Sequence, residues 1–345
     1  MGLVLILSNG CNKNPLGDGT TKKASNDIFI ITCHGNVYGY DWETLSLSSE
    51  LNIGRNPGNI IYSNDGRNIF ISSFSANSVS IIDANENTLI KTIHIDGEPN
   101  GVAFVAKSNR LYVSNITKNQ IEVIDLDTCQ IIAKIELIDS PYPLIASRSG
   151  DMVYTSTISG YFIAISTKDN NIKNSIKLEK EWLYSLALSS DDKFAYIASR
   201  SGNTIFIVDL ADFSLNKTIA NITKRPFPDG TIDDLVYSAN SNLLYYCDLN
   251  SNYVGAIDLQ QHKVINRIEV DRGPGDLDIS PNGKYLFSLQ FGAILMKPIP
   301  DSRRVMLNVR ATMNVIEIES MTVIKKVALS TAGATGIAVD PTLDF

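Results

Sequence analysis

A pattern of short apolar segments and polar turns recurs along this chain at intervals of about 42 residues. The two clearest copies begin at Ile69 and Leu111. In each copy, two apolar runs are separated by a polar turn, and an amphipathic run with a Gly- or Pro-containing turn follows. Seven residues close the middle run of successive copies: Asp41, Asp83, Asp125, Ser166, Asp209, Asp258 and Glu319. The sequence therefore contains seven repeats, and this number constrains the fold more than any other feature.

Each repeat contains four short runs rich in Ile, Val, Tyr and Phe, which Asn, Asp, Gly and Ser separate. These residue types are typical of strands and turns, and no segment shows convincing helical periodicity. Repeats of about 40–45 residues with four strands are typical of the blades of a β-propeller. One such sheet cannot bury both faces alone, so the blades must pack face to face around an axis. We predict an all-β, seven-bladed β-propeller with four-stranded blades.

Several segments resemble the YVTN-type β-propeller repeat. They are LYVSN at residues 111–115, GEPNG at 97–101 and GPG at 273–275. The resemblance covers residues 28–345 and is strongest in repeats two, three, five and six. Repeat four departs from it, with Ser166 in place of the acidic residue and EWL at 181–183 in place of the Gly-Pro turn. The resemblance implies a propeller of the bacterial surface or lipoprotein type, and it implies no particular role.

The two ends of the chain are expected to share one blade. The sequence enters the pattern at a second strand, residues 28–32, and continues with runs at 37–41 and 46–53. The final run at 336–339 matches the innermost strand at 101–104. We therefore predict that residues 27–345 form the propeller and that the C-terminal strand closes the first blade.

The first 26 residues are assigned to two segments outside the propeller. An apolar run, Leu3 to Leu7, precedes Cys11 and is far shorter than the ~20 residues of a membrane-spanning helix. The run and the cysteine resemble part of a bacterial lipoprotein signal, although no Lys or Arg precedes them. We predict a partial signal segment at 1–11 that is lipidated at Cys11, and a polar, flexible tether at 12–26. The alternative is a frayed N-terminus with an incidental cysteine.

Two insertions interrupt the repeat, at 221–231 between blades five and six and at 290–313 within blade seven. Strand direction alternates within a blade, so both insertions emerge on the same face of the disc. The second insertion has two apolar halves around residues 300–302 and is locally basic, which favours an extended hairpin. We predict that the ligand site lies on this face, the alternative being loops that merely cap the disc.

The innermost strands begin at that face, so their first residues are candidates for ligand binding. These candidates are Asn59, Asn100, Tyr142, Tyr184, Asp233, Asp234 and Asp276. Tyr142, Tyr184 and Trp182 could stack on a sugar, or they could be packing residues.

The acidic members of this set allow three interpretations. Asp234, Asp276 and Asp278 are candidate ligands for Ca²⁺ or Mg²⁺, since hard cations prefer oxygen donors. These carboxylates and that of Asp233 could instead form ion pairs with Arg272 or with the basic insertion, or they could lie in solvated turns. The acid that closes each middle strand is expected to be structural, because it can accept N–H bonds from the turn that follows.

The sequence excludes several kinds of chemistry. The net charge of −7 opposes binding to nucleic acid. The three His residues fall on different blades, and no zinc, haem-attachment, phosphate-loop or nucleophile-elbow motif is present. Cys33, Cys129 and Cys247 fall on blades that are not neighbours, so no disulfide is expected among them.

These observations predict a function class rather than a particular ligand. The expected protein is a non-catalytic, monomeric, extracytoplasmic binding propeller of the cell envelope, attached to the membrane only through a lipid anchor. Its ligand is a protein or a saccharide, and it needs no cofactor. The alternative is a propeller enzyme, similar to a lactonase or a lyase, that uses the carboxylates at the channel mouth with a divalent metal.

Overall fold

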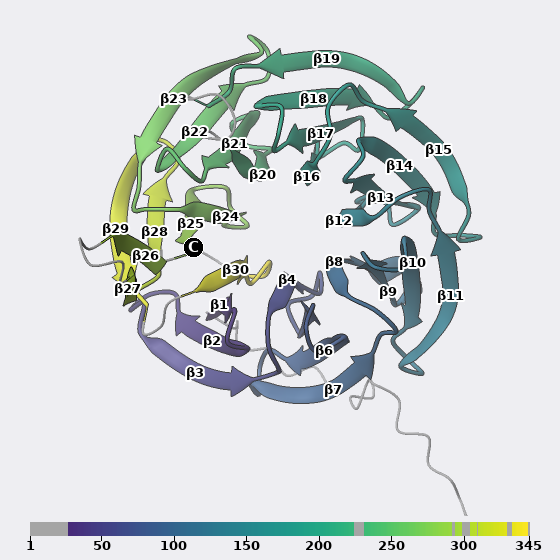
Figure 1. Ribbon diagram of the computed structural model, residues 1–345, viewed down its shortest axis with the longest axis horizontal. Helices are drawn as coiled ribbons and strands as arrows, with labels where there is room; N and C mark the ends of the chain where they lie inside the picture. Colours follow the sequence, from purple (N-terminus) through teal and green to yellow (C-terminus); the bar gives the residue numbers. More distant parts are fainter. Residues whose placement is uncertain are drawn as a thin grey trace, which may run out of the picture.

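The chain forms a closed ring of seven antiparallel sheets of four strands each (Figure 1). This computed structural model describes residues 27–223, 231–291, 294–298, 304–308, 310–329 and 333–343. The predicted signal segment and tether, with Cys11, lie outside the described residues, as does most of the insertion at 221–231. The seven-bladed β-propeller that the repeats predict is confirmed.

Blades two to five each use four consecutive strands, in chain order from the channel to the rim. Blade two contains β4 (Pro57–Tyr62), β5 (Asn68–Ser73), β6 (Ser78–Asp83) and β7 (Thr88–His94). Blade three contains β8 (Pro99–Val105), β9 (Arg110–Asn115), β10 (Gln120–Asp125) and β11 (Gln130–Glu136). Blade four contains β12 (Pro141–Ala146), β13 (Met152–Thr157), β14 (Tyr161–Ser166) and β15 (Ile172–Lys177). Blade five contains β16 (Leu183–Leu188), β17 (Phe194–Ser199), β18 (Thr204–Asp209) and β19 (Ser214–Ala220).

Blade six continues this order, whereas blade seven is interrupted. Blade six contains β20 (Ile232–Ser238), β21 (Leu243–Asp248), β22 (Tyr253–Asp258) and β23 (Lys263–Glu269). Blade seven contains β24 (Pro274–Ile279), β25 (Tyr285–Gln290), β28 (Thr312–Glu317) and β29 (Thr322–Ala328). Among the described residues, the only helical segment is one 3₁₀ turn, Ala106–Ser108, between β8 and β9.

Blade one joins the two ends of the described chain, as predicted. Its strands are β30 (Ala334–Val339), β1 (Asp27–Thr32), β2 (Asn36–Asp41) and β3 (Leu47–Asn52). The C-terminal strand β30 runs antiparallel to β1, with Ile337 opposite Ile30 and Val339 opposite Ile28. This pairing closes the ring, because it gives blade one four strands like the other six blades.

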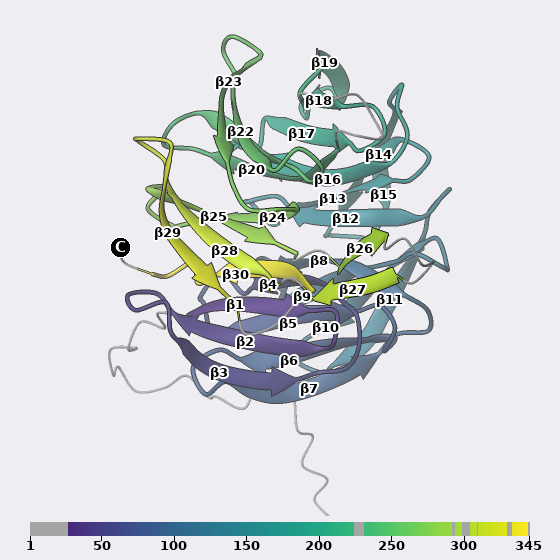
Figure 2. The same cartoon turned by 60° about the vertical axis from the view of Figure 1, so that its left-hand side comes forward.

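The insertion in blade seven contains a separate two-stranded hairpin. Strands β26 (Ile294–Pro298) and β27 (Arg304–Asn308) pair with each other, with Leu295 opposite Leu307, and join no other sheet. Figure 2 shows this hairpin apart from the four-stranded sheet of its blade. The extended hairpin that the two apolar halves predict is therefore present.

The core consists of one apolar cluster at each junction between neighbouring blades. For example, Phe70 and Ile81 of blade two pack with Val113 of blade three. At the closing junction, Phe287 and Met313 of blade seven pack with side chains of blade one. The seven clusters correspond to the seven junctions of the ring. Face-to-face packing of blades thus buries the apolar side chains that one sheet alone would expose.

The acid at the end of the middle strand has the structural role that the repeats indicate. Asp83 Oδ1 accepts hydrogen bonds from the backbone N–H groups of Asn85 and Glu86, at 2.9 and 3.0 Å. Bonds from the following turn also hold the pKa values of Asp41, Asp125 and Asp258 below their ordinary value.

For blade seven, the prediction that Glu319 closes the middle strand is wrong by two positions. Strand β28 ends at Glu317, which lies opposite Tyr285. Glu317 Oε2 accepts a hydrogen bond of 2.6 Å from the Ser320 hydroxyl. The long insertion before β28 interrupts the repeat, so the spacing from blade six gives no register for this strand.

The closing strand gives a test of the fold. Ile337 is 4% exposed and packs in the cluster between blades seven and one, whereas Ile324 on the outer strand β29 is 44% exposed. We expect Ile337→Ala to lower the free energy of unfolding by about 2–5 kcal/mol in urea titrations. Ile324→Ala should change it by less than about 0.5 kcal/mol. Equal losses in the two variants would contradict the closure of blade one by β30.

Candidate functional site

A β-bulge at the start of every innermost strand shapes the mouth of the central channel. In all seven blades the register between this strand and its neighbour shifts close to the start of the strand. The shift leaves Tyr184 unpaired in blade five, and it leaves Asp233 and Asp234 unpaired in blade six. Bulges re-aim side chains, and they are frequent beside functional sites. The bulges therefore release seven short segments from the sheets at one end of the channel.

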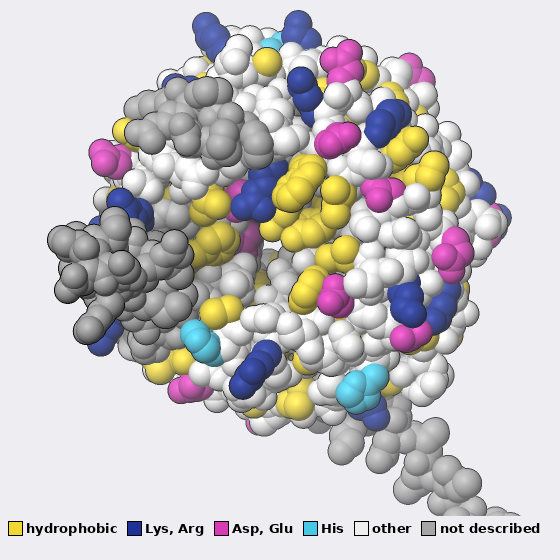
Figure 3. Space-filling view, in the orientation of Figure 1, with side chains coloured by type: hydrophobic (Ala, Val, Ile, Leu, Met, Phe, Trp, Pro, Cys, Tyr) yellow, Lys and Arg dark blue, Asp and Glu magenta, His cyan; other side chains and the backbone are white. Residues whose placement is uncertain are grey.

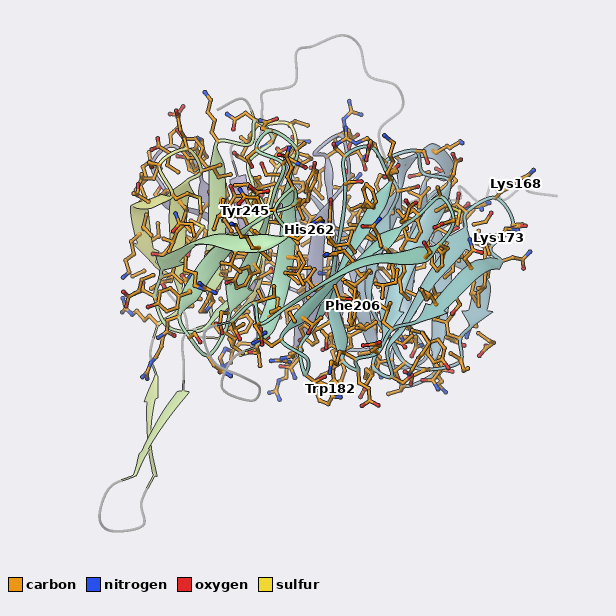
Figure 4. The ribbon with its side chains drawn as sticks, turned by 90° about the horizontal axis from the view of Figure 1, so that it is seen from above. Lys168, Lys173, Trp182, Phe206, Tyr245 and His262 are labelled. Atoms are coloured by element: carbon orange, nitrogen blue, oxygen red, sulfur yellow. The ribbon has the colours of Figure 1, made fainter. Side chains whose placement is uncertain are left out.

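These segments enclose a cavity of about 180 Å³ at the channel mouth. All seven residues predicted to bind a ligand line it: Asn59, Asn100, Tyr142, Tyr184, Asp233, Asp234 and Asp276. Ser185, Thr335 and Phe291 also line it, whereas Trp182 does not. Trp182 is 51% exposed and lies at the face from which the hairpin projects (Figure 4). The structure thus brings the predicted residues together and separates Trp182 from the two tyrosines.

One side of the mouth is a stack of four side chains from three blades. The rings of Tyr142 and Tyr184 lie 4.6 Å apart between centroids, and their hydroxyl oxygens are 3.2 Å apart. The guanidinium of Arg200 lies over the other face of Tyr184, at 4.6 Å from its centroid. Arg200 Nε and Nη2 in turn contact the two oxygens of Asp233, at 3.0 and 3.3 Å. Figure 3 shows hydrophobic, basic and acidic side chains gathered around this opening.

Arg200 is a residue of this site that the sequence reasoning missed. It follows the second strand of blade five, where its backbone N–H bonds to Trp182 O. The equivalent residue makes the equivalent bond in every blade and is otherwise Cys33, Phe74, Ile116, Ile158, Leu249 or Phe291. Arg200 is thus the one charged residue at a position where the other six repeats have Cys, Ile, Leu or Phe. Aligning the turns after the second strands, and not only the innermost strands, would have identified Arg200 and Phe291.

Burial controls the ionisation of this stack. Asp233 is 4% exposed, and burial raises its pKa to about 7, against the opposing effect of Arg200. The bidentate contact with Arg200 favours the ionised carboxylate, so the two charges largely cancel each other. Burial also raises the pKa of Tyr184. The phenol hydroxyl consequently stays protonated and can act as a hydrogen-bond donor.

The predicted metal ligands accept hydrogen bonds that connect neighbouring blades. Asp234 Oδ2 accepts a hydrogen bond from the Leu277 N–H of the next blade, at 3.0 Å. Asp276 Oδ2 and Asp278 Oδ2 accept bonds of 2.7 Å from Ile337 N and Val339 N of blade one. The same arrangement recurs where Asn59 Oδ1 accepts from Val102 N at 3.4 Å. These side chains satisfy backbone N–H groups that would otherwise lack a partner between two sheets.

Asp234 and Asp276 also form a close acid pair. Asp234 Oδ1 accepts a bond of 2.7 Å from the Ser185 hydroxyl, and a hydrogen bond connects Asp234 with Asp276. Burial, and then the charge of Asp234, raise the pKa of Asp276 well above its ordinary value. Burial also raises the pKa of Asp278, to about 7. These side chains keep some surface toward the narrow channel, but protein atoms surround them, so that surface provides little solvation.

The Ca²⁺ or Mg²⁺ site that the sequence predicts stays a prediction, since each of its three candidate ligands already accepts a backbone N–H group. In the described part of the chain, no group of three or more His, Cys, Asp and Glu side chains is arranged to hold a metal ion. The ion pair at the mouth also differs from the one considered, because Asp233 pairs with Arg200 and not with Arg272. Cys33 and Cys247 carry free thiols and do not line the mouth. Within the described ranges, no helix is long and apolar enough to span a membrane.

Comparison with known proteins supports the fold. No protein-family model and no curated protein sequence matches the chain. Among solved structures, Kuenenia stuttgartiensis hydrazine synthase is similar, with a TM-score of 0.68, 18% identity, and coverage of 83% of this chain and 90% of that chain. Dihydro-heme d1 dehydrogenase NirN in complex with DHE is also similar, with a TM-score of 0.66, 12% identity, and coverage of 95% and 78%. At these identities the likeness shows the propeller fold and nothing of the activity.

The acid pair makes stability depend on pH in a direction that can be worked out. A raised carboxyl pKa favours the protonated form in the folded state, so stability is greatest below the unfolded pKa of about 3.9 and is lost as pH rises. We therefore expect Tm to fall between about pH 4 and pH 7, where Asp233 and Asp278 titrate and Asp276 contributes. Asp276→Asn imitates the protonated acid and should reduce this fall by about 2 °C or more.

Exposed Glu319 supplies the control for this measurement. Glu319→Gln should leave the dependence of Tm on pH unchanged in scanning calorimetry. A Tm that rises steadily from pH 4 to pH 8 in the wild type would show that the channel acids are ionised in the folded state.

Proposed function

We propose that this protein is a non-catalytic binding propeller of the YVTN type, and that its ligand binds at the channel mouth on the face with the hairpin. One observation carries the proposal. The bulges bring an aromatic pair, an Arg–Asp ion pair and two Asn side chains to one small cavity. Packing of the blades does not require these residue types, since Gly, Thr and Pro occupy equivalent positions in other repeats.

The enzyme alternative loses its principal support. It depended on carboxylates at the mouth that could bind a divalent metal, and those of Asp234, Asp276 and Asp278 accept backbone N–H groups from the next blade. A tetrapyrrole is also a poor fit, although one structural neighbour is named for dihydro-heme d1. The cavity of about 180 Å³ is smaller than the ~300–1,000 Å³ typical of drug-sized ligands, and no His, Cys or Met lines it.

We also propose that the protein is an extracytoplasmic, lipid-anchored monomer of the cell envelope. This part of the proposal is supported by the apolar run before Cys11, the polar stretch at 12–26 and the resemblance to surface propellers. Its partner is a saccharide or a protein rather than nucleic acid, because the chain carries a net charge of −7.

A thermal-shift screen tests the binding function. The probes are neutral monosaccharides, choline, inorganic phosphate, and 5 mM CaCl₂ or MgCl₂. We expect at least one organic probe to raise Tm by about 2 °C, the shift expected when its concentration is about ten times Kd. Tyr142→Ala should abolish that shift. Tyr62→Ala, which removes a half-buried tyrosine that lines a different cavity, should retain it.

Two results of this screen would contradict the proposal. One is the absence of a shift with every organic probe. The other is a shift with Ca²⁺ or Mg²⁺ that Asp234→Asn removes, which would favour the metal-dependent enzyme.

Metabolic labelling tests the lipid anchor. In cells that produce the protein naturally, labelled palmitate should appear in the wild type and be absent from Cys11→Ser. Cys33→Ser removes a free thiol of the described structure and should retain the label. Unlabelled wild-type protein would exclude the lipoprotein assignment.

A further inference from the structure

The seven positions around the channel mouth are unequal in size and polarity. The bulge residues are large or polar in blades three to six, where they are Asn100, Tyr142, Tyr184 and Asp233. They are small in blades seven, one and two, where they are Gly275, Thr335 and Gly58. The cavity is therefore bounded by large or polar bulge residues on one side and by small bulge residues on the other.

A second aromatic ring lies across the small side. A Cβ atom on Gly275 would come within 1.9 Å of Phe291 Cζ, so only glycine at 275 allows the Phe291 ring to occupy this place. Both Phe291 and the Tyr142–Tyr184 pair line the cavity. The cavity thus has aromatic rings in its wall from blades four, five and seven.

The charges at the mouth disfavour an anionic ligand. The one basic side chain of the stack, Arg200, is paired with Asp233 at 3.0 Å. Asp234 accepts the Leu277 N–H and the Ser185 hydroxyl, and the carboxyl of Asp276 lies beside it. A phosphate or carboxylate would find no unpaired cation here, and it would be repelled by the acid pair.

Uncommitted amide groups remain at the mouth. Within the described residues, the Asn100 side chain makes no hydrogen bond, and that of Asn59 uses only Oδ1. An amide offers both donors and an acceptor, which matches hydroxyl groups that donate and accept at once. The raised pKa of the Tyr184 hydroxyl keeps it available as a further donor. The polar groups are therefore suited to a ligand with several hydroxyls and no charge.

We infer that the mouth binds a single ring of a neutral sugar, such as the terminal residue of a saccharide; this inference rests on the proposed binding function. The apolar C–H face of such a ring packs on an aromatic wall, while its hydroxyls bond to Asn59 and Asn100. A volume of about 180 Å³ lies below the ~300–1,000 Å³ typical of drug-sized ligands, which suits one ring and not a chain. Further sugar units would extend out of the mouth, past the face with the hairpin.

Saturation-transfer NMR with the full-length protein tests this inference. The probes are the methyl glycosides of glucose, galactose, mannose and N-acetylglucosamine. We expect at least one to receive saturation at its ring C–H protons, with a Kd of about 1 mM, which is reasonable for so few ligand atoms. Tyr142→Ala should weaken this binding about tenfold, and Tyr142→Phe, which keeps the ring, by less than about threefold.

The Asn100→Ala variant distinguishes an effect on sugar binding from an effect on folding. Its side chain makes no hydrogen bond within the described residues, so Tm should change by less than about 1 °C while sugar affinity falls about tenfold. Tyr62→Ala is the control that should leave sugar affinity unchanged. Unchanged sugar affinity in Asn100→Ala would overturn the assigned recognition.

The same experiment distinguishes this inference from the proposed function. No saturation transfer to any sugar at 50 mM, together with choline binding that Tyr142→Ala removes, would overturn the sugar and leave the binding function standing. Transfer to neither probe class would count against both.

Discussion

Neighbouring blades share no backbone ladder, so the innermost strands must find hydrogen-bond partners by other means. Each of the seven sheets is separate, and Leu277, Ile337 and Val102 point their N–H groups toward the preceding blade. A buried N–H group without a partner costs about 1–3 kcal/mol. Asp, Asn and Ser side chains of the preceding blade supply the missing acceptors. The polar side chains that line the channel are therefore needed to connect neighbouring blades, and binding a ligand is a second role for the same residues.

Acidic side chains are concentrated in the channel beside blade one, because the ring closes there. Blade one is held by pairing between β30 and β1 and not by a continuous chain. At this junction two carboxylates, those of Asp276 and Asp278, accept N–H groups of β30. Burial in the poorly solvated channel, and then the charge of Asp234, raise the pKa of Asp276. Clustered carboxylates thus arise here from the need to hold β30, and they are not by themselves a sign of metal binding.

The sequence allowed the blade number, the shared first blade and the residues of the mouth to be predicted, because strand periodicity and repeat phase fix where each innermost strand begins. It did not reveal what each carboxylate contacts, since the position of Asp234 along β20 is the same whether its oxygens face a ligand or Leu277 N. Arg200 was missed because it lies after a second strand, outside the aligned positions. Glu317 was misplaced because the hairpin insertion breaks the spacing.

The candidate site lies where the sequence departs from the repeat pattern. The atypical residues come from neighbouring blades and contact one another. The atypical segment at 181–183, which replaces a Gly-Pro turn, leads directly into Tyr184. Arg200 occupies a position that is apolar in the other six repeats, and its partly buried guanidinium pairs with the carboxylate of Asp233 from the next blade. Tyr142 of blade four completes the stack. A scaffold built only to close a ring would satisfy these positions with small or apolar residues, as blades one, two and seven do. The coordinated departure of three adjacent blades therefore favours a role for the mouth beyond structure.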